Sequence, residues 1–479
     1  MSLFISRKEQ SDSETERKSR SKRERLVWIG VTTVLITLLV ILAIAPRVSA
    51  QSRDQDARYY LKLFNDVFQF IENHYVDEEK TNPHALIEGA FKGLFEALDD
   101  PHSAYLTAEE MRRLRDDTQG EFGGVGIYIL TTDKGVEVAR PIEGTPAQRA
   151  GIRAGDVITA VEGQSIAKLS IDDVVKLLRG KPGSSVTVTI LRGESYSFNV
   201  TLARDMIEIP TVRSAIIPKN IGYLQVLKFT PMTADRIKDS LESLRREGFK
   251  SLIIDLRGNP GGLLSSVVDV ADLFFDEGAV IVSTRSRIPA DNRIYRSGEK
   301  PVVSTDMTII VLIDRYSASA SEILTGALKD SKRALILGET SYGKGSVQQI
   351  IPVDTGGFRL TTSKYYTPLG ISIDKVGITP DITVKRDDFT EEEIQSYRKL
   401  LEGGFIREFL SKNPNPSDEQ VISFVVNLQK QGIVLREERI KKEIRDVLNQ
   451  INSIQSMYDL EYDIVLKEAV RLLREGKVE

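Results

Sequence analysis

The sequence contains no cysteine and only three histidines among its 479 residues. The missing thiol excludes disulfide bonds, thiolate metal sites and a cysteine nucleophile, and three histidines leave little for a histidine metal cluster. We therefore expect neither a metal nor an organic cofactor, and any catalysis must use other side chains.

An excess of one charge is also missing. The net charge is -4, and the charged residues, 28% of the chain, interleave both signs. Such a surface gives no electrostatic reason to expect a nucleic-acid partner. The length exceeds that of one compact core, so several domains of about 100–200 residues each are expected.

The first 50 residues differ in composition from the rest. Residues 1–25 carry eight Lys or Arg, and an uncharged run from Leu26 to Ala45 follows. This run is long enough to cross the ~30 Å hydrocarbon core as a helix, with its basic flank in the cytoplasm. We therefore expect a membrane anchor at 1–50, with the catalytic domains on the extracytoplasmic (periplasmic) side. The alternative is an export signal cleaved near Ala50, where Val48-Ser49-Ala50 has the small-residue pattern of a cleavage site.

Hydrophobic periodicity divides the remaining chain into four regions. Residues 51–106 have helical spacing, 107–204 show short alternating strands, 205–388 alternate strands with helices, and 389–479 are charged and helical. We therefore predict a multidomain α+β protein with an α/β core at 205–388 and an inserted, mostly β domain at 107–204. The segment at 51–106 is expected to form a small helical module, the helical region at 389–479 to pack or to dimerise, and the histidines to be structural.

Two segments of the β region carry a recognisable pattern. Gly123 to Ile127 (GGVGI) is followed by residues 146–156 (PAQRAGIRAGD). Their order and spacing resemble a PDZ domain, which adds an extended chain end to a sheet edge and holds its carboxylate with backbone N–H groups. The resemblance implies a peptide-binding loop at Gly124, Val125, Gly126 and Ile127. The alternative is that these glycines only permit tight turns.

Ser319 lies between an expected buried strand at 308–313 and a helix at 320–328. A serine at such a junction has its hydroxyl near unpaired N–H groups and the positive end of the helix dipole, which suits acyl transfer. Ser319 with Glu322 three residues later is equally a capping box, which is an ordinary helix start.

The segment around Lys344 imitates a phosphate-binding loop, since Gly338 is followed by Gly343-Lys344. That motif needs Ser or Thr directly after the lysine, but position 345 is glycine. Residues 347–353 also read as a strand, where a phosphate loop would open a helix. We therefore expect neither nucleotide binding nor an ATP-driven protease.

The chain has a serine at a helix start, a later Gly-Lys pair and a glutamine four residues after the lysine. This pattern resembles that of the carboxyl-terminal processing peptidases, also called tail-specific proteases. The resemblance covers about residues 60–390 and includes 99–103 (DDPHS), 256–264 (LRGNPGGLL), 317–323 (SASASEI), 360–362 and 366–368. It implies a crotonase/ClpP-like peptidase core. Within that core it implies Ser319 as nucleophile, Lys344 as general base and Gln348 as the group that orients the lysine. It also implies an oxyanion hole formed by the N–H groups of Ala320 and Gly262, with Gly261 in reserve.

A lysine base requires a lowered pKa, because free lysine has a pKa of about 10.4 and is protonated at neutral pH. Burial can lower this pKa by up to ~3–5 units. Neutral Gln348 can hold the amine without raising its pKa, whereas a carboxylate would raise it by ion pairing. We therefore predict that the carboxylates of Glu322 and Glu339 point away from Lys344.

The sequence thus predicts a serine endopeptidase that recognises exposed C-terminal tails of protein substrates through its PDZ-like domain. Arg179, at the end of the second PDZ helix, is a candidate for coupling peptide binding to the active site, with a plain surface arginine as the alternative. A homodimer and an activating partner protein are further expectations. A non-catalytic PDZ scaffold and a lipid- or retinoid-binding relative are rival classes on the same fold. The presence of Ser319, Lys344 and Gln348 argues against both.

Overall fold

The computed structural model describes residue 32 and residues 56–479, apart from 133–134, 194, 386–387, 453–455 and 478–479. The chain divides into two compact units, Met1–Ala97 and Leu98–Glu479. In the first unit, residues 56–74 form a helix, followed by η1 (Glu78–Lys80) and α2 (Pro83–Glu96). These helices agree with the helical spacing of the sequence.

The predicted membrane anchor is not supported. Its apolar run, 26–45, lies outside the described residues except for Thr32, as does the cleavage pattern at Ala50. Among the described helices, none is both long and apolar enough to cross a membrane. The long helix at 56–74 carries five charged side chains, whose burial in hydrocarbon would be costly: Asp56, Arg58, Lys62, Asp66 and Glu72. The membrane-anchored localisation predicted above is therefore corrected, and the extracytoplasmic placement that depended on it is withdrawn.

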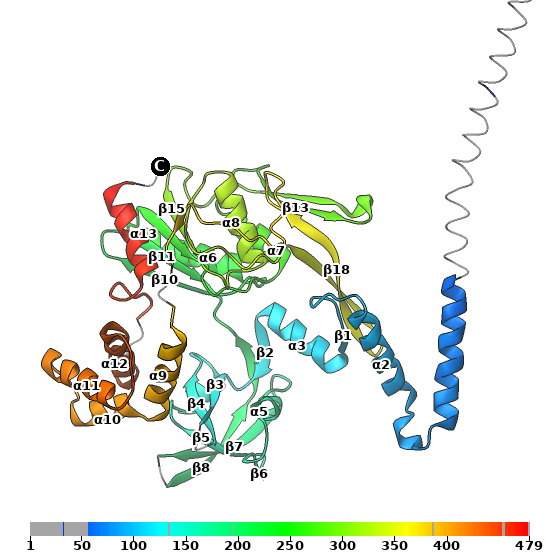
Figure 1. The fold of residues 1–479 in the computed structure, drawn as a ribbon, viewed down its shortest axis with the longest axis horizontal. Coiled ribbons are helices and arrows are strands. Elements are labelled where there is room, and N and C mark those ends of the chain that lie inside the picture. The colour runs from blue at the N-terminus through cyan, green and yellow to red at the C-terminus, as the bar shows by residue number, and fades with distance from the viewer. Residues whose placement is uncertain are drawn as a thin grey trace, which may run out of the picture. The chain divides into compact units, whose positions relative to one another are not determined.

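A six-stranded sheet organises the second unit (Figure 1). Its first strand is antiparallel to its neighbour, and the other pairs are parallel. In order across the sheet, the strands are β10 (Val212–Ile217), β11 (Ile221–Val226), β12 (Ser251–Asp255), β15 (Thr308–Ile313), β16 (Leu335–Gly338) and β19 (Ile382–Thr383). Strands β11, β12 and β15 are almost wholly buried, as is usual where both faces of a parallel sheet are covered.

Helices cover both faces of this sheet. Leu252 and Ile254 of β12 belong to one apolar cluster, which includes residues of α6 (Thr233–Arg246), α7 (Leu264–Ala271) and α8 (Ala320–Asp330). Ile253 between them belongs to a second cluster, which includes residues of α13 (Ile464–Glu475). Since successive strand residues face opposite sides, α13 packs on the face opposite to α6, α7 and α8. The predicted α/β core is confirmed, and a helix from far downstream completes it.

A second sheet contains the segment that follows Lys344. β17 (Ser346–Val353) and β18 (Gly356–Tyr366) form an antiparallel hairpin, and β18 also pairs with β1 (Ala104–Thr107) and β13 (Val280–Ser286). At the end of this sheet, β13 pairs with β14 (Arg293–Arg296). The strand predicted at 347–353 is thus confirmed, so Lys344 precedes a strand and not the helix that a phosphate-binding loop requires.

The inserted β region is built around a third sheet, in the order β3-β4-β5-β7-β8 with β6 (Gln164–Ser165) beside β5. The helices α4 (Pro146–Arg149) and α5 (Ile171–Leu178) contribute to its apolar core. α3 (Ala108–Gln119) lies at the start of the region, before this sheet, and β2 (Glu121–Gly124) pairs with β9 (Asp205–Glu208). The five strands are β3 (Ile127–Thr132), β4 (Gly135–Pro141), β5 (Val157–Val161), β7 (Ser185–Arg192) and β8 (Tyr196–Ala203).

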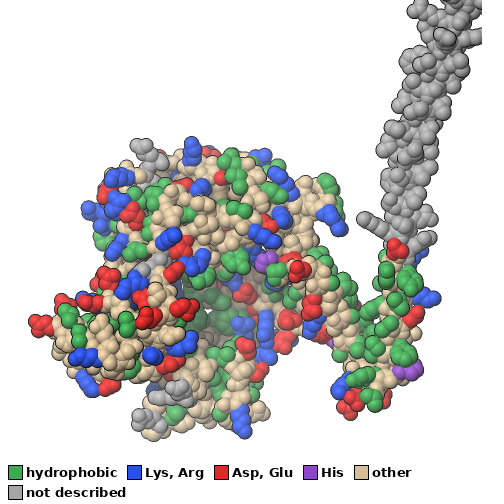
Figure 2. All heavy atoms as spheres, in the orientation of Figure 1, with side chains coloured by type: hydrophobic (Ala, Val, Ile, Leu, Met, Phe, Trp, Pro, Cys, Tyr) green, Lys and Arg blue, Asp and Glu red, His purple; other side chains and the backbone are tan. Residues whose placement is uncertain are grey.

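The region after β19 begins with four helices that share an apolar cluster of their own: α9 (Glu391–Glu402), α10 (Phe405–Lys412), α11 (Asp418–Lys430) and α12 (Glu437–Ile451). Figure 2 shows acidic and basic side chains mixed over these helices. The charged sequence of this region therefore reflects solvated helix faces, whereas α13 beyond it belongs to the core sheet.

Candidate active site

Ser319 occupies a strained turn between β15 and α8. Its backbone has φ 55° and ψ -113°, a conformation that non-glycine residues rarely adopt and that persists only where the surroundings enforce it. Neighbouring residues of the turn are fixed, since Ala318 N–H donates to Asn259 O (3.0 Å) and Ser317 Oγ donates to Leu256 O (2.9 Å). The predicted strand–turn–helix junction is present, and it is tied to the turn that follows β12.

That turn, 258–262, lies directly against Ser319. A Cβ on Gly261 would fall 2.8 Å from the Ser319 Cβ, and one on Gly262 would fall 1.9 Å from Phe229 O, so neither position admits a side chain. Gly261 N–H donates to Asn259 Oδ1 (2.8 Å). The N–H groups of Gly262 and Ala320 have no acceptor within the described residues. The backbone N–H groups of Gly262 and Ala320 are thus available as hydrogen-bond donors beside the serine, whereas that of Gly261 already donates to Asn259.

The carboxylate of Glu322 connects the serine turn to the lysine loop. It is fully buried and accepts hydrogen bonds from Ser319 N–H (2.8 Å), Ser341 Oγ (2.6 Å), Gly343 N–H (2.6 Å) and Lys344 N–H (2.9 Å). The carboxylate of Glu322 thus points toward the backbone of Lys344, and the prediction that it points away from this residue is wrong. No ion pair joins Glu322 to the Lys344 ammonium among the described residues. Glu339 instead contacts Arg315, at 3.1 Å.

Lys344 is half-buried, and its surroundings favour the neutral amine. Burial lowers the pKa of Lys344, and the positive charge of Arg359 lowers it further, while Asp100 and Glu322 act in the opposite direction. Burial also lowers the pKa of His102, with the charge of Lys344 as the next contribution. The pKa of Lys344 is therefore shifted in the direction that a general base requires.

The turn at 99–103 supports this environment. Asp100 accepts from His102 N–H (3.0 Å) and from Ser103 Oγ (2.6 Å), and Arg359 Nε donates to His102 O (2.7 Å). Sequence reasoning noted the motif but gave it no role and treated His102 as structural. Arg359 carries no local motif and could not have been found from its neighbours.

Gln348 lies on β17, with its amide directed at two hydroxyl groups. Nε2 donates to Ser346 Oγ (2.8 Å) and to Thr361 Oγ1 (3.2 Å), and Thr361 N–H donates to Ser103 Oγ (2.9 Å). In the described structure no hydrogen bond joins Gln348 to Lys344, so the orienting role of the glutamine stays a prediction.

Tyr365 is a further side chain at the serine that sequence reasoning missed. Burial raises the pKa of Tyr365 to about 12, and the nearby Ser319 side chain acts in the opposite direction. Tyr365 N–H also donates to Gly345 O (2.7 Å). Within the described residues, the Ser319 hydroxyl makes no hydrogen bond to Lys344 Nζ. Tyr365 of β18 thus lies near Ser319, and its backbone contacts the lysine loop.

The predicted peptide-binding loop lies at the start of β3, the end strand of its sheet. Val125 is buried, and Gly126 has φ 79° and packs so closely against Thr145 that a Cβ would fall 2.3 Å away. Within the described residues, no acceptor is present for the N–H groups of Val125 and Gly126. The loop and the unpaired outer edge of β3 therefore present backbone groups that an added strand could use.

Arg179 directly follows α5, and its contacts reach residues that precede the third sheet. Its Nη1 lies 3.4 Å from Asp116 Oδ2 of α3, and its guanidinium lies 4.3 Å from the ring centre of Phe122 on β2. The arginine thus contacts the segment that leads into the third sheet. These contacts fit a coupling role without testing it.

Comparisons with known proteins identify the family of three regions of the chain. Residues 220–384 match peptidase family S41, 137–192 match a PDZ domain, and 43–110 match the activating protease CtpB N-terminal domain. The chain is 41% identical to the carboxy-terminal-processing protease of Bartonella bacilliformis, over 70% of this chain and 77% of that protein. It is 33% identical to the carboxy-terminal processing protease CtpA of Bacillus subtilis, over 68% and 69%. Among solved structures, the photosystem II D1 C-terminal processing protease is 31% identical, over 68% of this chain and 93% of that one, with a TM-score of 0.41.

Replacing Glu322 tests whether its carboxylate joins the two loops. In Glu322→Gln, one acceptor oxygen becomes an NH₂ group that faces N–H donors, so we expect the free energy of unfolding to fall by about 1–3 kcal/mol. Urea unfolding of the full chain measures this, with Glu242→Gln on the exposed face of α6 as the control. Equal urea midpoints for the two variants would show that the carboxylate does not hold the loops together.

Proposed function

Because this chain belongs to the carboxy-terminal processing proteases of peptidase family S41, we propose that Ser319 is its nucleophile and Lys344 its general base. One observation carries the assignment. The buried carboxylate of Glu322 accepts hydrogen bonds from the backbone N–H groups of both residues, which fixes the serine turn and the lysine loop against each other. The strained serine backbone and the lowered pKa of the lysine support the same roles.

The proposed reaction is acyl transfer in two steps. Neutral Lys344 takes the proton of the Ser319 hydroxyl as the hydroxyl oxygen bonds to the carbonyl carbon of the substrate. The N–H groups of Gly262 and Ala320 bind the oxyanion of the tetrahedral intermediate. The ammonium then returns its proton to the leaving amine, and water hydrolyses the acyl-enzyme by the same route in reverse.

Two side chains must turn for this reaction. Among the described residues no hydrogen bond joins the Ser319 hydroxyl to Lys344, and the Gln348 amide donates to Ser346 and Thr361. We infer that Ser319 rotates toward Lys344 when substrate binds and that Gln348 then holds the amine. A neutral amide can do so without raising the pKa of the lysine, as a carboxylate would.

The PDZ domain is proposed to select protein substrates by their exposed C-terminal tails. The tail would add to the outer edge of β3, and its carboxylate would accept from the N–H groups of Val125 and Gly126. Arg179 is proposed to transmit peptide binding through its contacts to Asp116 and Phe122. The homodimer and the activating partner stay predictions.

The nucleophile and base are tested together in the full chain. We expect Ser319→Ala and Lys344→Ala each to cut an unstructured protein with an apolar C-terminus at least about 10³-fold more slowly than the unmodified chain, without ATP or metal. Product masses measure the cleavage, and Lys375→Ala, an exposed lysine, is the control. Cleavage by both variants at the unmodified rate would contradict the assignment. A folded but inactive unmodified chain would favour a non-catalytic PDZ scaffold.

The pH dependence of cleavage tests how Lys344 is kept neutral. Because the base must be unprotonated, activity rises with pH through the pKa of Lys344. Arg359→Gln removes a charge that lowers this pKa, so the rise should move to higher pH, whereas Arg359→Lys should leave it in place. Profiles of kcat/KM against pH measure the shift. A rise at unchanged pH in Arg359→Gln would mean that another group limits the reaction.

Tail recognition is tested with one substrate in two forms. Amidating the C-terminus removes the charge that the PDZ loop would bind, so we expect KM to increase about tenfold or more while the cleavage sites stay the same. Steady-state kinetics with the free-acid and amide forms measure this. Equal KM values would place substrate selection elsewhere.

A further inference from the structure

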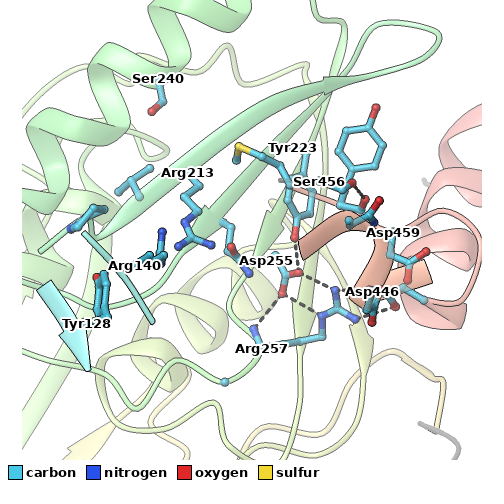
Figure 3. Close-up of a pocket in the computed structure, with 18 of the residues that line it drawn as sticks. Tyr128, Arg140, Arg213, Tyr223, Ser240, Asp255, Arg257, Asp446, Ser456 and Asp459 are labelled. Carbon is cyan, nitrogen blue, oxygen red and sulfur yellow. Dashed lines mark hydrogen bonds and ion pairs between the residues drawn. The ribbon is translucent and has the colours of Figure 1, made fainter. Parts of the chain in front are cut away.

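Arg257 forms a buried clasp between two carboxylates. Its Nε and Nη2 donate to Asp255 (2.9 and 2.6 Å), and its Nη1 and Nη2 donate to Asp463 (2.9 and 2.7 Å). Tyr223 Oη donates to Asp255 as well (2.7 Å). The Arg257 side chain is only 13% exposed. Figure 3 shows Asp255, Tyr223 and Arg257 converging. All three residues line a cleft of about 1360 Å³.

Arg257 lies directly before the Gly258–Gly262 turn, which carries the proposed oxyanion-hole donor Gly262. Gly258 N–H donates to Asp314 Oδ1 (2.9 Å). Further along the turn, Asn259 O accepts from Ala318 N–H and from Ser321 Oγ, both at 3.0 Å. A shift of the guanidinium would therefore move the backbone that carries Gly262.

The second carboxylate comes from a distant part of the chain. Asp463 precedes α13 and caps it, since its Oδ1 accepts from Leu466 N–H (3.0 Å). The helix is fixed in turn, because Leu466 and Ala469 are buried against Ile253 and other residues of the core sheet. The match to peptidase family S41 ends at residue 384, so this carboxylate lies outside the matched region.

We propose that Asp463 is a positioning residue for peptide hydrolysis, which holds the Gly258–Gly262 turn through Arg257 and makes the C-terminal helix part of the catalytic apparatus. The inference rests on the proposed role of Gly262 in the oxyanion hole. Bidentate Arg–carboxylate pairs fix orientation as well as contact, and oxyanion donors must be aligned with the transition state and not with the substrate. Loss of the pair should therefore slow turnover without weakening substrate binding.

The test compares two neighbouring bidentate pairs in the full chain. Asp463→Asn keeps the helix cap but loses the charge, so kcat should fall about 10- to 100-fold at unchanged KM. Its matched control is Asp459→Asn, because Asp459 forms the same kind of pair with Arg445 (2.9 and 2.7 Å) and does not contact the turn. The control should keep its kcat. Affinity for a peptide aldehyde, whose tetrahedral adduct uses the oxyanion hole, should fall only in Asp463→Asn.

A second variant, Arg257→Lys, tests the same contact if Asp463→Asn folds poorly. Arg257→Lys keeps the charge but cannot span both carboxylates, so it should lose kcat to the same degree, and the double variant should lose no more than either single one. The inference would be overturned if the kcat of the double variant fell by the product of the two single losses, or if kcat were unchanged in Asp463→Asn. If Ser319→Ala still abolishes cleavage in that case, the proposed function stands without it.

Discussion

The active site depends on one buried carboxylate. A charge taken out of water is tolerated only where donors surround it, and Glu322 has four, drawn from the serine turn and from the lysine loop. Because these donors are backbone N–H groups and the hydroxyl of Ser341, the carboxylate fixes both loops without forming an ion pair with the lysine. Burial can therefore keep the Lys344 amine neutral although an acidic side chain lies next to its backbone.

The sheet explains why these loops meet. β12, β15 and β16 are adjacent and parallel, so the turn after β12, the serine turn after β15 and the lysine loop after β16 leave the same edge. Ligand sites of parallel sheets form at this carboxyl edge. The Arg257 clasp fixes the first turn from the other face, where α13 covers the sheet, so both faces contribute to the site.

Local patterns predicted the family, the serine-peptidase class and the fold, because the motifs at 256–264, 317–323 and 343–345 lie within single turns. They could not place side chains that meet through the fold. Glu322 was expected to point away, since its capping position says nothing about a loop that folds back onto it. Arg359, Tyr365 and Asp463 reach the site from strands or helices far along the chain. The membrane anchor inferred from composition has no counterpart among the described helices.

The most direct test of the account is the rate at which a fluorophosphonate modifies Ser319, followed by intact mass and peptide mapping. The account predicts a single adduct on Ser319 in the unmodified chain. It also predicts that the adduct forms about 100-fold more slowly in Glu322→Gln, where the serine turn and the lysine loop lose their common acceptor. Equal rates in the two proteins, or an adduct on another residue, would contradict the claim that this carboxylate assembles the site.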